Sequence, residues 1–182
     1  MRNGKSTAIT ITAILFVLGA YLAAAQIAPP TDVPPQLAVP AGFELVLSAR
    51  GVGSQIYTCK TDANGIFSWT LKAPEAELRD SNNNDKVIGH HFAGPTWKLD
   101  DGSEVTGKAA AHVDSPDVDS IPWLLVNVVS HAGKGLLTSV TTIQRLHTHG
   151  GKPPATGCDE SHKNAETKSS YTADYYFYAP KA

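Results

Sequence analysis

Clusters of lysine and arginine are absent from this sequence. The chain has 15 Lys and Arg residues against 17 Asp and Glu, and the basic residues are spread singly along it. Nonspecific nucleic-acid binding needs a concentrated basic surface, and adsorption to a membrane surface needs a basic patch, so the sequence supports neither role. We therefore expect no nucleic-acid partner.

Cysteine is also scarce, because Cys59 and Cys158 are the only two in the sequence. In an oxidising compartment such a pair persists as a disulfide, which would tie the tail of the chain to an early strand. For a bond that closes a long loop, measured gains in stability are about 2–4 kcal/mol. The alternative is two unrelated thiols, one in the core and one in a loop.

The common catalytic and cofactor motifs are missing. The chain has no G-x-S-x-G nucleophile elbow, no H-E-x-x-H zinc motif and no P-loop. Residues 51–53 (GVG) begin like a dinucleotide fingerprint, but the third glycine is missing and a strand pattern follows. Residues 80–91 begin like a calcium loop, but Asp85 replaces the glycine and His91 the bidentate glutamate. We expect no cofactor; paired carboxylates for glycoside hydrolysis stay open, because sequence does not show their separation.

Long apolar runs are absent except at the N-terminus. Arg2 and Lys5 precede an uncharged apolar run over residues 8–22, and alanines follow at residues 23–25. This layout predicts a secretory signal peptide over residues 1–25, with cleavage after Ala25. The run is shorter than the roughly 20 residues of a membrane-spanning helix, which favours cleavage over an uncleaved anchor. We expect a secreted or periplasmic protein with no stable membrane anchor after cleavage.

A long helical period is absent as well, and strand and turn signals take its place. Residues 26–40 are rich in proline, so we expect an extended tether or edge segment there. The expected strands cover residues 43–48, 55–60, 66–72, 87–92, 96–99, 104–111, 122–129, 137–146 and 171–178. Residues 41–182 are therefore predicted to form an all-β fold, a single-domain antiparallel sandwich or barrel of about nine or ten short strands.

Turn residues punctuate these strands. Residues 62–65, 80–85 and 100–102 combine Asp, Asn and Gly in the manner of hairpin turns. Residues 150–170 lack apolar periodicity, so we expect a long loop, which Cys158 would hold in place.

Seven histidines supply the candidates for metal chemistry. His147 and His149 form an H-x-H pair, which on a strand projects to one face, as in extracellular zinc or copper sites. A third ligand could come from His90, His91, His112 or His131. The alternative is that both rings of the pair are solvated at a strand end. We expect no bound metal and keep His147 and His149 as the candidate ligands.

Trp97 is the aromatic candidate for ligand stacking. It lies between a Gly-Pro pair at residues 94–95 and the turn at 100–102, which allows a position near the surface, where its ring could stack on a sugar or another flat ligand. In sandwiches a strand tryptophan is more often a packing residue, which is the alternative for Trp97 and our expectation for Trp123 within its apolar run. A lone histidine near Trp97 is expected to be a hydrogen-bonded packing residue.

A series of short motifs extends along nearly all of the chain that follows the predicted signal peptide. In order they are VPAG (39–42), IYTC (56–59), HFAGPTW (91–97), DGS (101–103), IPWLL (121–125), IQRL (143–146), GG (150–151) and YTADY (171–175). This set resembles a family of exported bacterial and fungal proteins catalogued only as a domain of unknown function. The resemblance implies export, a single domain and a Cys59–Cys158 pair, and it implies no activity.

The polar residues within or beside these motifs are the candidate binding residues. They are His91, Asp101, Ser103, Gln144 and Arg145, to which Trp97 is added as the stacking candidate. The alternative is structural: turn chemistry explains residues 101–103, and a strand edge or a salt bridge explains residues 144–145.

Two classes of function follow from these observations. We expect an exported binding or structural module of the cell envelope or extracellular space, whose ligand would be a small molecule, a carbohydrate or a protein. The alternative is a cell-envelope hydrolase or metal-dependent enzyme whose site is assembled from scattered polar residues. A pocket that brings two or more of His91, Asp101, Ser103 and Arg145 within hydrogen-bond reach would favour the enzyme, and their dispersal would count against it.

Overall fold

The computed structural model describes residues 28–83 and 85–181. The expected signal peptide, residues 1–25, lies outside this part of the chain. The strands are β1 (Phe43–Thr61), β2 (Phe67–Asp80), β3 (Val87–Phe92), β4 (Thr96–Leu99), β5 (Glu104–Val113), β6 (Trp123–Ala132), β7 (Thr142–Gly150) and β8 (Glu166–Pro180). Three short 3-10 turns are η1 (Pro35–Leu37), η2 (Leu136–Ser139) and η3 (Glu160–His162). No helix within the described residues is long and apolar enough to cross a membrane.

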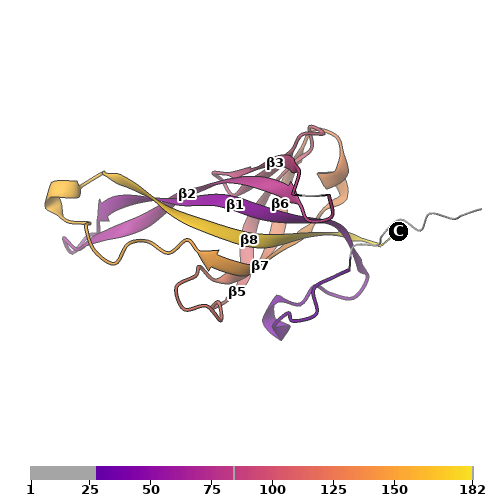
Figure 1. Cartoon of the computed structure of the whole chain (residues 1–182), viewed down its shortest axis with the longest axis horizontal. Coiled ribbons are helices and arrows are strands. Elements are labelled where there is room, and N and C mark those ends of the chain that lie inside the picture. Colours follow the sequence, from indigo (N-terminus) through magenta and orange to yellow (C-terminus); the bar gives the residue numbers. More distant parts are fainter. Residues whose placement is uncertain (1–27, 84, 182) are drawn as a thin grey trace, which may run out of the picture.

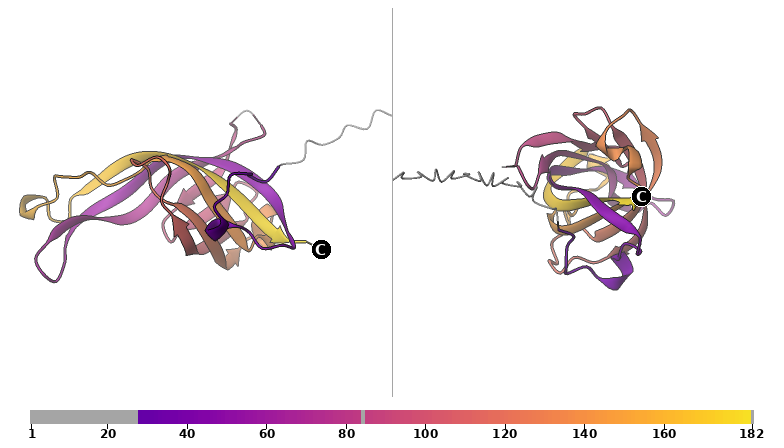
Figure 2. Two further views of the ribbon diagram at one scale, coloured as in Figure 1. Left: turned by 90° about the horizontal axis from the view of Figure 1, so that it is seen from below. Right: turned by 90° about the vertical axis from the view of Figure 1, so that its right-hand side faces the viewer.

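The eight strands form one closed antiparallel barrel in which neighbours in sequence pair and β1 closes the ring on β8. The end-on view in Figure 2 shows this ring. The all-β prediction is confirmed, and of its two alternatives the chain adopts the barrel. Eight strands replace the expected nine or ten partly because residues 43–48 and 55–60 belong to one strand. Gly51 and Gly53 lie inside that strand, where it packs closely against its neighbours.

A second difference concerns the expected strand at residues 137–146. Its first residues form η2, and β7 begins only at Thr142. Leu137 and Val140 are both buried against the barrel core, so this apolar spacing serves a 3-10 turn that closes one end of the barrel.

β1, β2 and β8 are the longest strands, and they extend beyond the ring as a three-stranded arm (residues 54–61, 67–75 and 166–170), shown in Figures 1 and 2. Residues 151–165 run along this arm. The Tyr57 hydroxyl donates to the Gly151 carbonyl at 2.7 Å, and Trp69 Nε1 donates to the Thr156 carbonyl at 2.9 Å. The predicted Cys59–Cys158 disulfide is present, and it joins positions 99 residues apart.

The barrel interior is filled by alternate residues of each strand. On β8, Tyr175 and Phe177 are fully buried, while Tyr176 between them faces outward and packs against the cluster around Leu37. Large rings fit because small residues lie beside them. A Cβ placed on Gly51 would lie 2.5 Å from a carbon of the Tyr175 ring, and one on Gly107 would lie 3.1 Å from the Trp97 ring. The glycines on the inner face thus make room for the aromatic core.

A smaller apolar cluster lies on the outside of the barrel and is covered by the N-terminal segment (residues 28–40). Leu37 is fully buried there against Trp123 and Leu146. Gln144 holds the segment, because its Nε2 donates to the Leu37 carbonyl at 2.7 Å. The segment was expected to be extended; it contains one 3-10 turn, η1, and packs on the barrel wall.

Candidate functional site

The predicted site residues lie in separate parts of the barrel. His91, Trp97 and Arg145 face the interior, Asp101 and Ser103 hold the β4–β5 turn, and Gln144 faces the N-terminal segment. Of the four residues whose meeting would favour an enzyme, Asp101 and Ser103 form the one hydrogen-bonded pair found within the described chain. The interior group of His91, Trp97 and Arg145 is therefore the candidate site.

His91 and Trp97 form a stacked pair on the inner face of β3 and β4. They are opposite each other in register, their ring centroids are 4.3 Å apart and their planes differ by 11°. Tyr175 meets the imidazole edge-on at 5.3 Å. Trp97 is only 2% exposed, so its ring packs in the core. Of the two alternatives for Trp97, a near-surface stacking position and a packing position, the structure shows the packing position, because the barrel turns this side of β4 inward.

Burial fixes the protonation state of His91. Desolvation lowers its pKa to about 3, and only the hydrogen bond to the Thr96 carbonyl opposes that shift. The ring is therefore neutral at physiological pH. Its Nδ1 lies 2.9 Å from the Thr96 carbonyl oxygen, which can only accept, so the proton resides on Nδ1. Nε2 is left as a hydrogen-bond acceptor, and no side chain or backbone group in the described chain donates to it.

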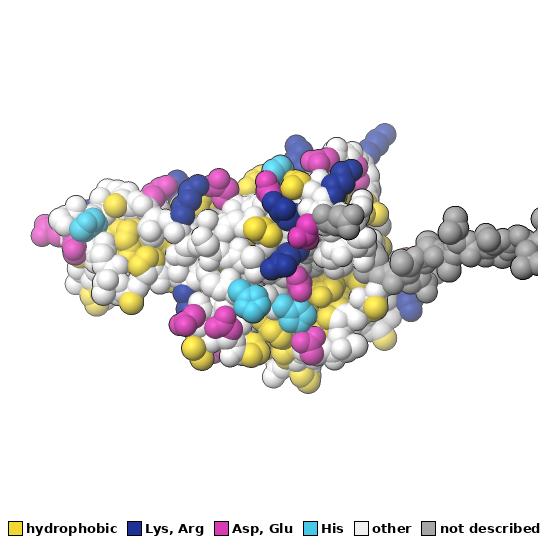
Figure 3. Space-filling model, viewed as in Figure 1, with side chains coloured by type: hydrophobic (Ala, Val, Ile, Leu, Met, Phe, Trp, Pro, Cys, Tyr) yellow, Lys and Arg dark blue, Asp and Glu magenta, His cyan; other side chains and the backbone are white. Residues whose placement is uncertain are grey.

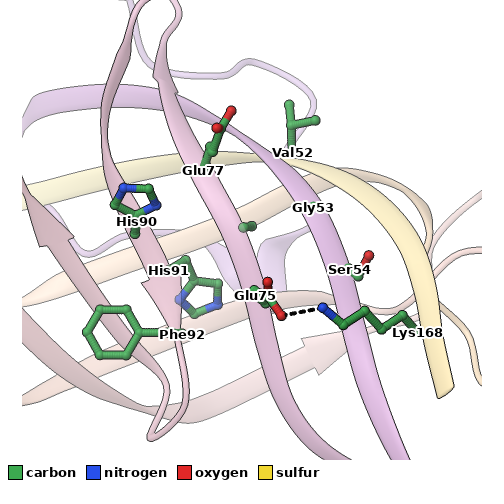
Figure 4. Close-up of a pocket in the computed structure, with 10 residues that line it drawn as sticks. Val52, Gly53, Ser54, Glu75, Glu77, His90, His91, Phe92 and Lys168 are labelled. Atoms are coloured by element: carbon green, nitrogen blue, oxygen red, sulfur yellow. Dashed lines mark hydrogen bonds and ion pairs between the residues drawn. The ribbon is translucent and has the colours of Figure 1, made fainter. Parts of the chain in front are cut away.

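A cavity of about 490 Å³ reaches His91 from the outside of the barrel (Figure 4). It opens where β3 ends, because β2 pairs with β3 only up to the Ala76–His91 position and then runs on into the arm. The lining residues are Val52, Gly53, Ser54, Glu75, Ala76, Glu77, His90, His91, Phe92 and Lys168. Beyond this position β2 no longer has β3 beside it, and part of the barrel interior is exposed there.

The charges around this cavity are paired at its rim. Glu75 binds Lys168 at 2.7 Å, and Glu77 binds Arg79 at 2.6 Å. Figure 4 shows the Glu75–Lys168 pair bridging the strands beside His91. Phe92 adds an aromatic ring that is 37% exposed. The cavity consequently offers a neutral acceptor, a partly exposed aromatic face and carboxylates whose charge is already balanced.

Asp101 and Ser103 have a structural role at the barrel end away from the arm. Asp101 Oδ1 accepts from the Ser103 backbone and hydroxyl, and its Oδ2 accepts from the Leu136 backbone at 2.7 Å. The Ser103 hydroxyl in turn accepts from the Leu137 backbone at 3.2 Å. Burial acts to raise the pKa of Asp101, but these hydrogen bonds outweigh it and the pKa is lowered. The pair therefore fixes η2 over the barrel end.

Arg145 carries a positive charge on the inner side of the barrel wall. It lies opposite Tyr175 in register, and its guanidinium donates to the Pro122 carbonyl at 2.8 Å. Its Nε is buried without a hydrogen-bond partner in the described residues, among which it also forms no ion pair. The hydroxyls of Tyr171 and Tyr175 lie 3.1 Å apart nearby, and burial raises the pKa of both. Arg145 is thus part of a polar interior layer.

The H-x-H pair lies at a β-bulge in β7. The bulge falls between Leu146 and His149, and His147 has a φ of +47°. Each ring faces different carboxylates: His147 contacts Asp32 and Asp174, whereas His149 lies 3.6 Å from Asp117. Figure 3 shows histidine and acidic side chains side by side in the middle of this face. In the part of the chain that the structure describes, no group of three or more His, Cys, Asp or Glu residues could hold a metal ion.

Two groups combine serine, histidine and aspartate, but neither has relay geometry. Asp117 lies between Ser120 and His149, so the imidazole does not contact the serine. In η3 the same nitrogen of His162, Nδ1, meets both Ser161 and Asp159. A Ser-His-Asp relay needs the two contacts on opposite ring nitrogens. Both groups instead stabilise their loops.

Several residues that shape the site carry no signal in the sequence. Glu75 and Lys168, which meet at the cavity rim, are 93 residues apart. Asp32 and His147 are 115 residues apart. Strand alternation in β8 does predict that Asp174 faces away from Tyr175, but nothing local indicates which residue it meets.

Comparison with known families gives one match. A family model described as a protein of unknown function (DUF3455) matches residues 40–179. No curated protein and no solved structure matches the chain. The matched range includes β1 to β7, β8 up to Ala179, the disulfide and the cavity beside His91. The chain belongs to the DUF3455 family of proteins of unknown function.

Proposed function

We propose that this protein is an exported binding module that holds a neutral, hydroxyl-bearing small molecule, of which a carbohydrate is the best example, in the cavity beside His91. The observation that carries the proposal is the unpartnered Nε2 of a buried neutral imidazole at a cavity of about 490 Å³. This nitrogen is not among the fully buried atoms that lack a partner, so a ligand hydroxyl or a water in the cavity can reach it and donate to it.

The rest of the cavity supports the same ligand chemistry. Glu75 and Glu77 already have cationic partners, so a charged ligand would meet no excess charge of opposite sign. Their remaining oxygens can accept hydrogen bonds from further hydroxyls. The exposed ring of Phe92 can contact the apolar C–H face of a sugar. His91 is held rigidly by Trp97 and Tyr175, which reduces the entropy lost on binding.

Export is supported by two independent features. The N-terminal sequence has the layout of a signal peptide. The Cys59–Cys158 disulfide is of a kind that persists in an oxidising compartment and is rare in the cytosol. We propose a secreted or periplasmic location on these grounds.

The hydrolase alternative has less support from the geometry. Asp101 and Ser103 contact each other, but both already hold η2 at the barrel end away from His91. Arg145 donates to a backbone carbonyl within the wall. The two Ser-His-Asp groups lack relay geometry. A binding module is therefore the function we propose.

The proposal is tested by binding of neutral saccharides, monitored by NMR shift changes and calorimetry. We expect shifts at His91, Phe92 and Glu75, and a Kd about tenfold weaker for His91→Phe, which keeps the stacked ring but removes the Nε2 acceptor. Phe92→Ala should also weaken binding, and it is a surface change that spares the fold. Val129→Ala, an exposed apolar position outside the cavity, is the matched control and should bind normally.

Two results would contradict the proposal. Saccharide-induced shifts confined to another face would place the site elsewhere. Equal affinity of Phe92→Ala, His91→Phe and the wild type would show that the cavity does not hold the ligand.

A further inference from the structure

The N-terminal segment is held on the barrel by two kinds of contact. Apolar contacts come from Leu37 and Val33, which cover the outer cluster around Trp123 and Leu146. Polar contacts come from Gln144, bonded to the Leu37 carbonyl, and from His147, bonded to Asp32. Of these groups, only the pair of His147 and Asp32 can change its charge near neutral pH, through the imidazole of His147.

His147 lies between two carboxylates, one on each of its ring nitrogens. Nδ1 is 2.9 Å from Asp174 Oδ2 on β8, and Nε2 is 3.0 Å from Asp32 Oδ2 in the N-terminal segment. The ring is fixed by edge-on contacts with Trp123 at 5.2 Å and Tyr176 at 6.4 Å. The imidazole thus bridges the segment to the barrel wall.

We propose that His147 is a pH-operated clasp that docks the N-terminal segment at mildly acidic pH and loosens it as the pH rises past neutrality. Only the imidazolium has a proton on both nitrogens and can donate to both carboxylates. When the ring is neutral, one nitrogen presents a lone pair to a carboxylate. One of the two contacts is then repulsive, and Asp32 is the partner free to move because it lies on a short covering segment.

The charges around His147 agree with this assignment. The N-terminal segment contributes Asp32, and β8 contributes Asp174 and Tyr176. Arg50 on β1 lies opposite Asp174 in register, so it offsets part of that negative charge. On β7 itself, exposed His149 faces Asp117, and Arg145 donates to the Pro122 carbonyl.

The direction of the pH effect follows from the shifted pKa values. Burial of the His147 ring acts to lower its pKa, but the hydrogen bonds to Asp174 and Asp32 outweigh burial and raise it above its usual value. The hydrogen bond to His147 lowers the pKa of Asp32. The clasp is therefore complete below about pH 6.5, where the free imidazole would also be protonated, and is lost as the pH rises through the raised pKa of His147.

Release of the clasp has a structural consequence. The segment would lose the link from Asp32 to His147, and the remaining contacts of Leu37 would hold it less firmly over Trp123 and Leu146. At higher pH this part of the barrel wall would be uncovered more often. The clasp thus couples external pH to the exposure of an apolar surface, independently of the cavity beside His91.

The test follows the His147 ring and the segment together by NMR between pH 5 and 9. We expect the ring signals of His147 and the amide signals of Leu37 and Ala38 to titrate with one midpoint above about pH 6.5. Amide exchange of Leu37, corrected for its intrinsic pH dependence, should be about fivefold faster above that midpoint.

Asp32→Asn isolates the clasp, because it changes an exposed side chain of the covering segment and leaves the barrel intact. It should lower the His147 midpoint and abolish the pH response of Leu37. His149→Gln, on the same strand, is the matched control and should leave both unchanged. A Leu37 amide whose exchange does not respond while His147 titrates would overturn the proposal, as would an unchanged midpoint in Asp32→Asn.

Discussion

Trp97 and His91 form a packed aromatic pair inside the barrel. Trp97 touches His91, Tyr175 and Phe177, and its indole Nε1 is buried without a hydrogen-bond partner in the described residues. The pair therefore contributes chiefly through packing, and it presents His91 to the cavity in a fixed orientation. Its two members are separated by only the β3–β4 hairpin.

Replacement of Trp97 by alanine should reduce the free energy of unfolding by about 3–5 kcal/mol, because it leaves a large cavity in the core. Urea denaturation measures this change. Trp69→Ala is the matched control: that ring is only partly buried on the arm, so the loss should be near 1 kcal/mol. If Trp97→Ala were as stable as the wild type, the ring would not be packed as we describe.

For the binding candidates Asp101 and Ser103, the structural alternative of turn chemistry accounts for part of what the structure shows. Asp101 and Ser103 do cap a turn, with Ser103 fully buried. Their contacts to Leu136 and Leu137, more than 30 residues away, could not be predicted from the turn. Only barrel closure brings the β6–β7 connection to the β4–β5 turn.

At the scale of elements, η2 closes one barrel end and depends on a single carboxylate. Leu137 is fully buried, and the Leu136 and Leu137 backbone groups donate to Asp101 and Ser103. A strand was expected over residues 137–146 because that stretch alternates and contains β-branched residues. The end of the barrel instead requires a compact turn that places both side chains over the core.

Asp101→Ala should destabilise the protein by about 1–2 kcal/mol and speed amide exchange at Leu136, because that N–H loses its acceptor. Hydrogen exchange followed by NMR locates the effect. Asp100→Ala is the matched control, since the structure shows no side-chain hydrogen bond for Asp100 among the described residues, and it should change neither quantity. Equal effects of the two substitutions would mean that the Asp101 contacts do not hold η2.

At the scale of the whole molecule, the barrel and the arm are stabilised differently. The barrel has a continuous aromatic and aliphatic core. In the arm, β2 extends past the end of β3 and β8 extends past the end of β7, so both strands have an unpaired edge. The arm is stabilised by residues 151–165 and by the disulfide. Lys72 and Pro74 lie on the free part of β2, and such residues discourage pairing with another chain.

Replacement of both cysteines by alanine should lower the free energy of unfolding by about 2–4 kcal/mol, because the unfolded chain is then no longer constrained. Circular dichroism should still report a β protein, since the barrel core does not depend on the bond. Reducing agent should lower the stability of the wild type by a similar amount and leave the double variant unaffected. An unchanged denaturation midpoint in the double variant would contradict this account.

Much of the architecture could be predicted because it depends on local pattern. Alternation in residues 171–178, the turns at 62–65 and 100–102, and the two cysteines indicated strands, hairpins and a disulfide. The site could not be predicted to the same extent. His91 was named as a candidate, but its buried neutral ring and its cavity depend on where β3 ends against β2.

The sequence by itself determined the all-β class, the turn positions and the chemistry of the side chains, because strand alternation and turn propensity act over a few residues. Only the tertiary structure decided which side chains meet. Register across eight strands sets which face each residue occupies, and closure of β1 on β8 brings together residues as distant as Asp32 and His147. Both the cavity beside His91 and the clasp at His147 depend on that register, which no short segment of the chain encodes alone.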